Sequence, residues 1–539
     1  PDTAVLTTGR SFISGVDSAT RGEGLFVGLR GLNPEFSLVL IDGMPVAQGL
    51  PHSRSVQMNM IPPEGFGQVL VHRTGRPDLE GDLIAGAIDF RTLRAQDLAE
   101  RRRAEISLAG RLEPLAHRYD EPGLGGSQAL MLAGRFGATD QLGLSLSLRH
   151  ETRRTVSSEM AGVMSARNDD GWAWGWSSTA GPKYHGTPRD PNHPERDLVL
   201  TALNVGVSEV SSQNRSVLLA MDYQPDAHVS LRLTLADLGA RNRQNSTLSQ
   251  VVGGARQWIP DPQGGYRLSL GEVSSRVWYE TNPDFVSLKA ATLTGRILLP
   301  SSPAFRSGTL ILTPRLSLSR SASDRPDRIE ASIRINQNDK YNKDQAARPY
   351  TGQLIVAGKG FPQPLLTPAL RDDLDQAATR LLARRAGQRS EQHSAQTRLQ
   401  AAMDAEWLTG SEQGLVSLKA GLSVSQSDRD VTDLNWTNAP VAEVLGKAGV
   451  TWADLGVTKG TWSSVWPGVY DWRAPRVDHD ALVALYWRSV TPESFDRCGK
   501  LYVNNLNCGT QSGREQVAST YVMSTVRQGQ WEITGGLRH

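Results

Sequence analysis

Aromatic side chains gather in two polar stretches that the sequence pattern assigns to loops. Trp172, Trp174 and Trp176 stand at alternate positions after two aspartates. A flat ring can cover the C–H face of a pyranose while polar neighbours bind its hydroxyls, so this pattern indicates a sugar site. The later loops hold the remaining candidates for the same role, which are Trp436, Trp462, Trp466, Tyr470 and Trp472.

Two alternatives stay open for these rings. They could form an aromatic girdle at a membrane interface, or pack a loop on itself. The girdle is the better interpretation for Trp407, Trp487 and Trp531, because these three lie beside strand patterns.

The two cysteines, Cys498 and Cys508, lie close together in a polar stretch. Their position predicts a disulfide that closes an exposed loop, with two free thiols as the alternative. One such pair is not a convincing metal site. The sequence contains no Gly-x-Ser-x-Gly, His-Glu-x-x-His, phosphate-binding loop or Cys-x-x-Cys motif. We therefore predict no catalytic residues, no metal and no cofactor, and do not expect an enzyme.

Composition narrows the class of protein. The chain has 539 residues, with 58 Lys+Arg against 56 Asp+Glu, which is not the basic footprint of a nucleic-acid binder. Its mean hydropathy is -0.36, and no apolar run reaches the roughly 18 residues that a spanning helix needs. A membrane β-barrel stays possible, because its strands are apolar only at alternate positions.

From about residue 103 onward the chain alternates between apolar and polar residues. The clearest segments are 142–148, 229–235, 309–319 and 414–425, where Leu and Val alternate mainly with Ser, Thr, Arg, Lys and Gly. Successive side chains of a strand point to opposite faces, so each segment has one apolar and one polar face. Many segments reach ten residues, and short turns alternate with long loops. Both features favour an antiparallel transmembrane barrel over a β-sandwich, with about a dozen strands present.

Residues 1–95 have a different residue pattern, with short apolar runs and turn dipeptides such as Asp42-Gly43 and Thr74-Gly75. Four elements follow in order: Arg30-Gly31, the run 37–46 around Asp42-Gly43, the segment from Ile61-Pro62 to Gly75, and 85–92 around Gly86. Their order and spacing resemble the plug domain of TonB-dependent outer-membrane receptors, in the style of the Xanthomonas- and Caulobacter-type branch.

The resemblance implies a mainly β fold with an N-terminal α+β plug, residues 1–95, inside a large barrel, residues 96–539. Such barrels close with about 22 strands, so we expect the sequence to be cut at both ends, with the TonB-coupling box upstream of Pro1. The plug motif residues are Arg30, Gly31, Asp42, Gly43, Arg73, Gly75 and Gly86. Arg30 and Arg73 are expected to pair with carboxylates of the barrel wall, or else to be solvated at the surface.

The predicted function is active uptake across the outer membrane of a Gram-negative cell. The expected partners are a TonB-type complex, a scarce or bulky ligand and outer-membrane lipid, but no nucleic acid. The tryptophans favour an oligosaccharide as ligand, with an iron–siderophore as the alternative. Two other classes stay open: a TonB-dependent signalling receptor and a secreted lectin or glycosidase.

Overall fold

The structure is a computed structural model. It describes residues 3–6, 25–51, 53–161, 172–174, 184–186, 198–200, 202–260, 262, 266–299, 308–335, 352–355, 363–411, 414–436, 449–489 and 510–539. The predicted Cys498–Cys508 disulfide and Trp176 lie outside these residues, and the side chains of Trp172, Trp174 and Trp436 are also outside the description.

Residues 3–6 and 25–99 form a small N-terminal unit around a four-stranded sheet with the order β4-β3-β6-β5. Strand β3 runs parallel to β6, and β5 runs antiparallel to it. The elements are β1 (Thr3–Leu6), β2 (Phe26–Leu29), η1 (Pro34–Phe36), β3 (Ser37–Ile41), β4 (Met44–Pro45), η2 (Met58–Met60), β5 (Phe66–His72), β6 (Gly86–Thr92) and η3 (Ala95–Asp97). Strand β1 pairs with β2. The sequence predicts an α+β plug; within the described residues this unit is a mixed sheet whose helical elements are the 3-10 turns η1, η2 and η3.

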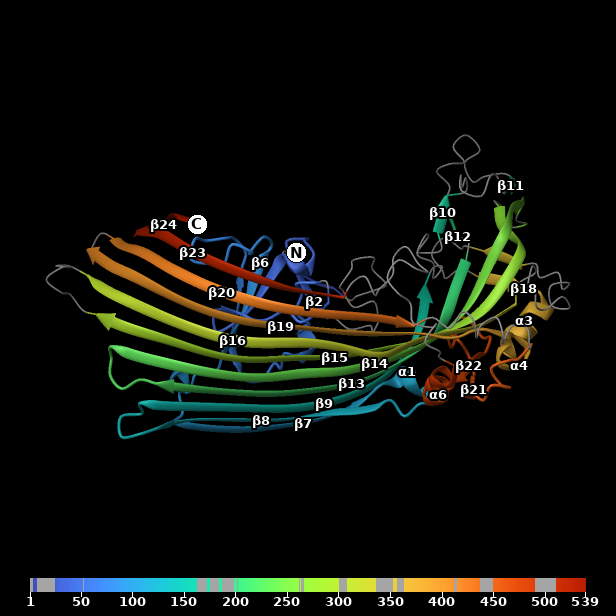
Figure 1. The fold of residues 1–539 in the computed structure, drawn as a ribbon, viewed down its shortest axis with the longest axis horizontal. Coiled ribbons are helices and arrows are strands. Elements are labelled where there is room, and N and C mark those ends of the chain that lie inside the picture. The colour runs from blue at the N-terminus through green and yellow to red at the C-terminus, as the bar shows by residue number, and fades with distance from the viewer. Residues whose placement is uncertain are drawn as a thin grey trace.

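The rest of the described chain is dominated by one curved antiparallel sheet (Figure 1). Its main path has the order β24-β23-β20-β19-β16-β15-β14-β13-β9-β8-β7. These strands are β7 (Arg102–Leu112), β8 (Leu124–Phe136), β9 (Leu142–Ala161), β13 (Ala202–Tyr223), β14 (Val229–Pro260), β15 (Tyr266–Leu299), β16 (Thr309–Ile335), β19 (Leu382–Ser411), β20 (Gly414–Trp436), β23 (Gln511–Gln528) and β24 (Trp531–Arg538). Neighbours in the path are also neighbours in sequence, apart from the short strands inside the long loops. The predicted antiparallel barrel wall is confirmed, and all its strands except β7 and β24 are longer than a bilayer requires.

One face of this sheet, which we call the inner face, packs against the N-terminal unit. Leu25, Phe26 and Ile41 of the unit are at most 1% exposed and share one core with Leu218, Leu238 and Leu288 of the sheet. The unit therefore completes its core with side chains of the wall. Backbone contact is also close, because a Cβ on Gly49 would lie 2.4 Å from the carbonyl carbon of Ser321.

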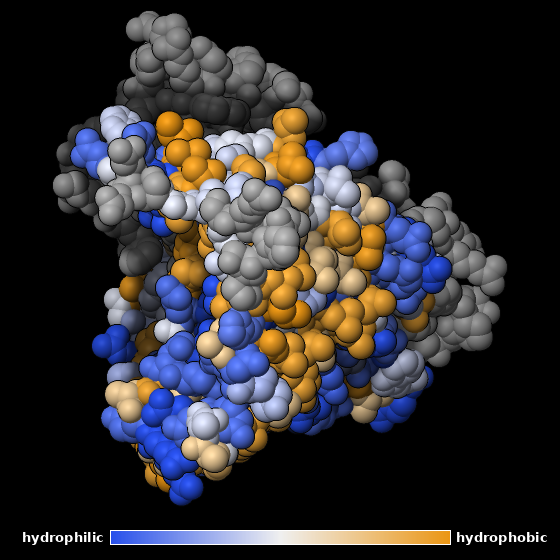
Figure 2. Space-filling model, turned by 90° about the vertical axis from the view of Figure 1, so that its left-hand side faces the viewer, coloured by the Kyte–Doolittle hydropathy of each residue, from blue (hydrophilic) through white to orange (hydrophobic). Residues whose placement is uncertain are grey.

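The opposite, outer face carries the apolar residues of the alternating segments. In β16, Leu316 and Leu318 are 49% and 51% exposed, whereas the alternate residues Ser317 and Ser319 are buried, and Ser319 accepts from the Ala47 amide of the N-terminal unit. In β20, Leu418 and Leu422 are exposed and Ser417 is buried. Seen from the end where the short turns lie, hydrophobic residues form a broad band across the molecule (Figure 2). The prediction of an apolar outer and polar inner face is confirmed.

The two ends of the sheet differ as predicted. Short connections such as 137–141 and 224–228 lie at one end, and the long loops lie at the other (Figure 1). The loops contain short elements: α1 (Pro114–His117), β10 (Trp172–Trp174), β11 (Tyr184–Gly186), β12 (Leu198–Leu200), β17 (Gly352–Ile355), β18 (Gln363–Leu366), α3 (Pro368–Asp375), α4 (Ala377–Arg380), β21 (Thr458–Trp462), β22 (Ala474–Val477) and α6 (His479–Ser489). None of the described helices is long and apolar enough to span a membrane.

Segments 114–119, 367–383 and 449–489 build a second core, which we call the loop core. It packs on the extended ends of the long strands, where Val205, Val207 and Val277 are at most 1% exposed. Val205 and Val207 have the same parity on β13 as the exposed Val217 and Leu219, so the loop core covers the outer face beyond the apolar band. This cover explains how β13 to β16 can extend so far beyond the thickness of a bilayer.

The exposed outer leucines generate a test of the membrane assignment. Leu293 of β15 is 44% exposed within the apolar band. We expect Leu293→Arg to lower the free energy of unfolding in lipid vesicles by about 2–4 kcal/mol, because the guanidinium would enter hydrocarbon. Leu365 of β18 is equally open, at 49%, but lies in a long loop, so Leu365→Arg serves as the control with less than about 1 kcal/mol. Urea titration measures both, and equal losses would refute a lipid-facing band.

Candidate functional site

The contact between the N-terminal unit and the inner face is the most highly connected polar region that the structure describes. Its centre is Asp42, in the turn after β3, where Asp42 and Gly43 have φ angles of 49° and 80°. Asp42 is 6% exposed. Its Oδ1 accepts from the Thr92 amide at 2.9 Å, and its Oδ2 accepts from the Thr92 hydroxyl at 2.7 Å and the Thr234 hydroxyl at 2.6 Å. The predicted Asp-Gly turn is thus bonded directly to strand β14 of the wall.

Arg232 neutralises this buried carboxylate from the wall. Its Nε lies 3.5 Å from Asp42 Oδ2, and its Nη1 donates to Asp222 Oδ1 at 2.5 Å. Its Nη2 also donates to the carbonyls of Thr92 and Leu93, at 2.9 and 3.2 Å. One guanidinium therefore ties the end of β6 to two strands of the sheet. A buried carboxylate is stable only with such pairing.

A second cluster lies on the segment between β5 and β6. Lys419 of β20 donates to Asp78 Oδ2 at 2.8 Å, and Arg76 lies 2.6 Å from the same oxygen. Burial by itself would raise the pKa of Asp78, but the hydrogen bonds from Arg76 and Lys419 outweigh it and lower the pKa to about 2. Glu80 nearby accepts from Arg538 at 3.0 Å and from Gln400 at 2.5 Å.

The sequence predicts that basic residues of the plug pair with carboxylates of the wall, but four ion pairs across the interface have the opposite arrangement. Acidic groups of the N-terminal unit meet basic groups of the wall in the pairs Asp42–Arg232, Glu64–Arg149, Asp78–Lys419 and Glu80–Arg538. Arg30 does not reach a wall carboxylate within the described residues; it is exposed, and its Nη1 donates to the Arg73 carbonyl at 3.2 Å. The predicted pairing of Arg30 is corrected accordingly. For Arg73 the structure describes an exposed side chain on the same surface.

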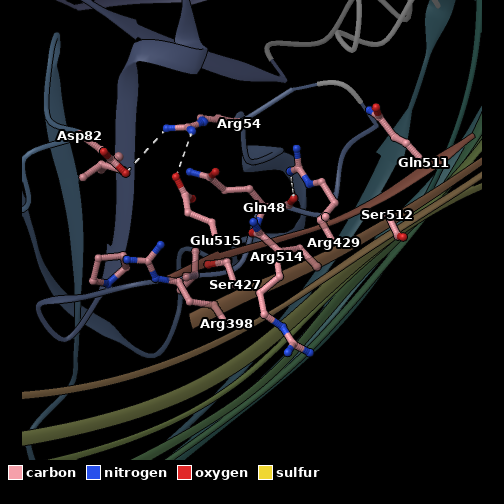
Figure 3. A pocket seen from close by; sticks show the side chains of 15 residues that line it. Gln48, Arg54, Asp82, Arg398, Ser427, Arg429, Gln511, Ser512, Arg514 and Glu515 are labelled. Carbon is pink, nitrogen blue, oxygen red and sulfur yellow. Dashed lines mark hydrogen bonds and ion pairs between the residues drawn. The ribbon is translucent and has the colours of Figure 1, made fainter. Parts of the chain in front are cut away.

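A cavity of about 350 Å³ separates part of the N-terminal unit from β19, β20 and β23 (Figure 3). Arg54 bridges Asp82 at 3.7 Å and Glu515 at 3.8 Å across it. Arg429 donates to the carbonyls of Gln48 and Ser53. Arg398, Ser427, Gln396 and Gln511 complete the polar lining. Arg514 points the other way and pairs with Asp428 at 2.5 Å. The cavity can hold polar or anionic groups.

The remaining plug motif glycines keep their predicted conformations where the structure tests them. Gly31 has a φ of 75°, as expected for a turn. Gly86 has a φ of 143°, and a Cβ there would lie 2.6 Å from the His72 carbonyl oxygen and 2.7 Å from Leu29 Cδ1. Only glycine fits this position. Gly75 has open space around it and shows no such constraint.

Four of the aromatic candidates in the later loops have described side chains, and none of these four is exposed for a ligand. Trp462, Tyr470 and Trp472 are each 3% exposed and belong to the loop core, and Trp466 is half-buried against Tyr470. Tyr119 meets Trp462 edge-to-face with ring centroids 5.8 Å apart. These rings hold the loops together, so the alternative of a loop that packs on itself describes them and the sugar-stacking role is corrected.

Two of the three tryptophans predicted for the aromatic girdle lie on wall strands, and the third lies on a helix of the loops. Trp407 and Trp531 lie on β19 and β24 near the short turns, and Trp531 is 69% exposed. Trp487 instead lies on helix α6, where the Arg389 guanidinium stacks 4.2 Å from its ring. The pattern beside Trp487 is helical, so that residue is corrected from the girdle to the loops.

The residues that make the interface could have been found by parity. Arg232 and Lys419 interrupt the polar faces of 229–235 and 414–425 with a charge, at positions that must point inward if the leucines point outward. The sequence does not indicate the partner of either residue. Asp42 and Arg232 are 190 positions apart, and Asp78 and Lys419 are 341 positions apart.

Comparison with known proteins identifies the N-terminal unit. Residues 3–87 match the family model described as the TonB-dependent receptor plug domain. Residues 3–87 are therefore a plug domain of the TonB-dependent receptor type. From here on the N-terminal unit is called the plug. Members of this family are receptors and transporters that act with a ligand and the TonB complex.

Other comparisons are weaker. No curated protein sequence matches the chain. Among solved structures, the ferric enterobactin receptor of Pseudomonas aeruginosa is 10% identical, with a TM-score of 0.28, and the match covers 95% of this chain and 85% of that one. The siderophore receptor PirA of the same organism is 12% identical, with a TM-score of 0.21 and coverage of 76% and 83%. At these TM-scores neither supports an argument about the fold or the ligand.

The central ion cluster generates a stability prediction. We expect Asp42→Ala to lower the free energy of unfolding of the plug by about 3–5 kcal/mol, because Arg232 and two hydroxyls would lose their buried partner. Asp82 is the matched control: its side chain is 52% exposed and 3.7 Å from Arg54, so Asp82→Ala should change stability by less than about 1 kcal/mol. Limited proteolysis of the plug in urea reports both values. Similar losses in the two variants would contradict the central role of Asp42.

Proposed function

We propose that this receptor imports a bulky polar ligand by moving the plug away from the inner face of the wall. The supporting observation is the interface itself: the plug shares its core with Leu218, Leu238 and Leu288 and is bonded to the wall through Arg232, Lys419 and Arg538. A path through such a contact requires external work, since several buried ion pairs must separate. A TonB-type complex that pulls on the plug from the short-turn side would supply that work.

A cross-link between plug and wall tests this proposal. The hydroxyls of Thr92 and Thr234 are 3.5 Å apart, so the double variant Thr92→Cys/Thr234→Cys brings two thiols together across the interface. We expect oxidation to abolish uptake while ligand binding to intact cells persists, and reductant to restore uptake. The two single variants are controls for the loss of each hydroxyl. Normal uptake by a fully cross-linked receptor would refute the proposal.

For the ligand we propose a neutral oligosaccharide, and the support comes from polar side chains of the inner face. Trp462, Tyr470 and Trp472 pack into the loop core on the outer face, so stacking on these rings no longer contributes. The inner face beyond the plug is instead rich in amides and hydroxyls, namely Asn204, Ser208, Ser212, Asn242, Gln244, Ser246 and Gln250. Ser212 donates to Asn242 at 2.6 Å, whereas neither amide atom of Asn204 has a partner in the described part of the chain. Such groups suit sugar hydroxyls, which both donate and accept.

The second candidate is a ferric siderophore. The observation that favours it is the cavity between plug and wall, where Arg54, Arg398 and Arg429 outnumber Asp82 and Glu515. An anionic iron complex would be attracted by this excess of positive charge. The Xanthomonas/Caulobacter-type assignment, which together with the tryptophans favours an oligosaccharide at the level of sequence, stays a prediction.

Gene expression and uptake separate the two ligands. If the proposal is right, transcript levels rise at least severalfold with a neutral oligosaccharide as carbon source, and iron starvation leaves them unchanged. The substitution Asn204→Leu should lower uptake of that oligosaccharide, because it removes two hydrogen-bonding atoms from a side chain of similar volume. Induction by iron starvation alone, with uptake of a ferric siderophore, would establish the alternative. Either result is compatible with the cross-linking test of plug movement.

A further inference from the structure

The outer face of the wall carries a group of basic side chains that the uptake mechanism does not use. This basic patch consists of Arg154 on β9, Arg215 on β13, Arg241 and Arg243 on β14, and Lys289 on β15. All five are exposed. Their parity is that of the outer leucines: Arg215 is followed at even spacing by Val217 and Leu219, which are 42% and 37% exposed.

Strand register places these residues beside one another. Ser211 of β13 is paired with Arg154 on one side and with Arg243 on the other. Arg215 is paired with Gly239, two residues before Arg241, and its Nε lies 4.0 Å from where a Gly239 Cβ would be. Neighbouring strands are about 4.8 Å apart and alternate residues about 6.8 Å apart, so the cationic groups gather within a small area.

Within the described residues, none of the five has an ion-pair partner. Other basic residues of the molecule do: Arg514 on the same face pairs with Asp428 at 2.5 Å, and Arg476 of the loop core pairs with Glu209 at 3.2 Å. Asp237, paired in register with Lys289, is an acidic neighbour at the lower edge. Like charges gathered in one small area repel one another, so this arrangement favours an external anion.

The position of the basic patch along the strands, between the apolar band and the loop core, indicates which part of the membrane it contacts. Directly below it, towards the short turns, the outer face is apolar at Leu219, Leu235, Leu293 and Leu318. This apolar band ends near the turn at 224–228, which gives a span close to the roughly 9–11 residues that cross the hydrocarbon. Above the basic patch begins the loop core. The five cations therefore lie at the level of the headgroups of the leaflet on the long-loop side. Phe285 beside Arg241, with its ring centroid 5.7 Å from the guanidinium, suits that interface.

We propose that the basic patch binds the phosphate groups of a phosphorylated lipid in that leaflet. Guanidinium groups bind phosphate with two parallel hydrogen bonds, and the adjoining leucines would contact the acyl chains. A lipid satisfies both parts of the surface at once, whereas a soluble anion would use only the charges. The occupant we infer is therefore a lipid that carries more than one phosphate.

Lipid binding by purified receptor in neutral-detergent micelles tests this inference, with diphosphoryl lipid A and its monophosphoryl form as probes. We expect the diphosphoryl form to bind at least ten times more tightly, and the triple variant Arg215→Gln/Arg241→Gln/Arg243→Gln to lose that preference. The control variant Arg103→Gln/Arg111→Gln/Arg527→Gln removes the same charge from exposed residues that have acidic partners, and should bind like the original protein. Heat-modifiable gel mobility confirms that every variant is folded.

Three outcomes would overturn the inference. They are equal binding of the two lipid forms, an unchanged preference in the triple variant, and displacement of the lipid by millimolar inorganic pyrophosphate, which would make the patch a site for soluble anions. Raised salt should weaken binding in the original protein, because exposed charges are screened. None of these outcomes bears on plug movement or on the ligand, which depend on the inner face.

Discussion

The structure depends on one constraint: every strand of the wall must show an apolar side to lipid and a polar side to something that satisfies it. In hydrocarbon an unpaired polar group is destabilising by several kcal/mol, so at the level of the apolar band the polar side chains of the wall point to the inner face. There the plug supplies their partners. Ser145 donates to the Leu93 carbonyl, Ser319 accepts from the Ala47 amide, and Thr234 donates to Asp42. The plug therefore satisfies polar groups on the inner face of the wall.

The same constraint explains the distribution of charge. Acidic residues of the plug are buried against basic residues of the wall, and each carboxylate that loses water gains a guanidinium or ammonium. Charged pairs of this kind are weak contributors to net stability but are strongly destabilising when only one partner is removed. An interface that uses them is therefore sensitive to the loss of either partner of a pair.

Beyond the membrane the wall needs another covering. The extended ends of β13 to β16 keep apolar residues on their outer face, and the loop core buries them with Trp452, Trp462, Trp472 and Tyr486. The aromatic residues of the loops thus replace lipid where the strands leave it. Between the apolar band and the loop core lies the basic patch, at the level where charge can meet headgroups. The apolar band, the basic patch and the loop core therefore follow one another along the same strands.

The sequence by itself determined the two-part architecture, the faces of the strands and the turns of the plug, because these depend on local periodicity and on backbone conformation at residues such as Gly31 and Gly43. It also indicated the inward position of Arg232 and Lys419 through parity alone. The tertiary structure decided which groups meet: Asp42 with Arg232, Asp78 with Lys419, and the loop tryptophans with the outer face rather than with solvent. Exposure and pairing depend on segments hundreds of residues apart, and a local pattern contains no information about that distance.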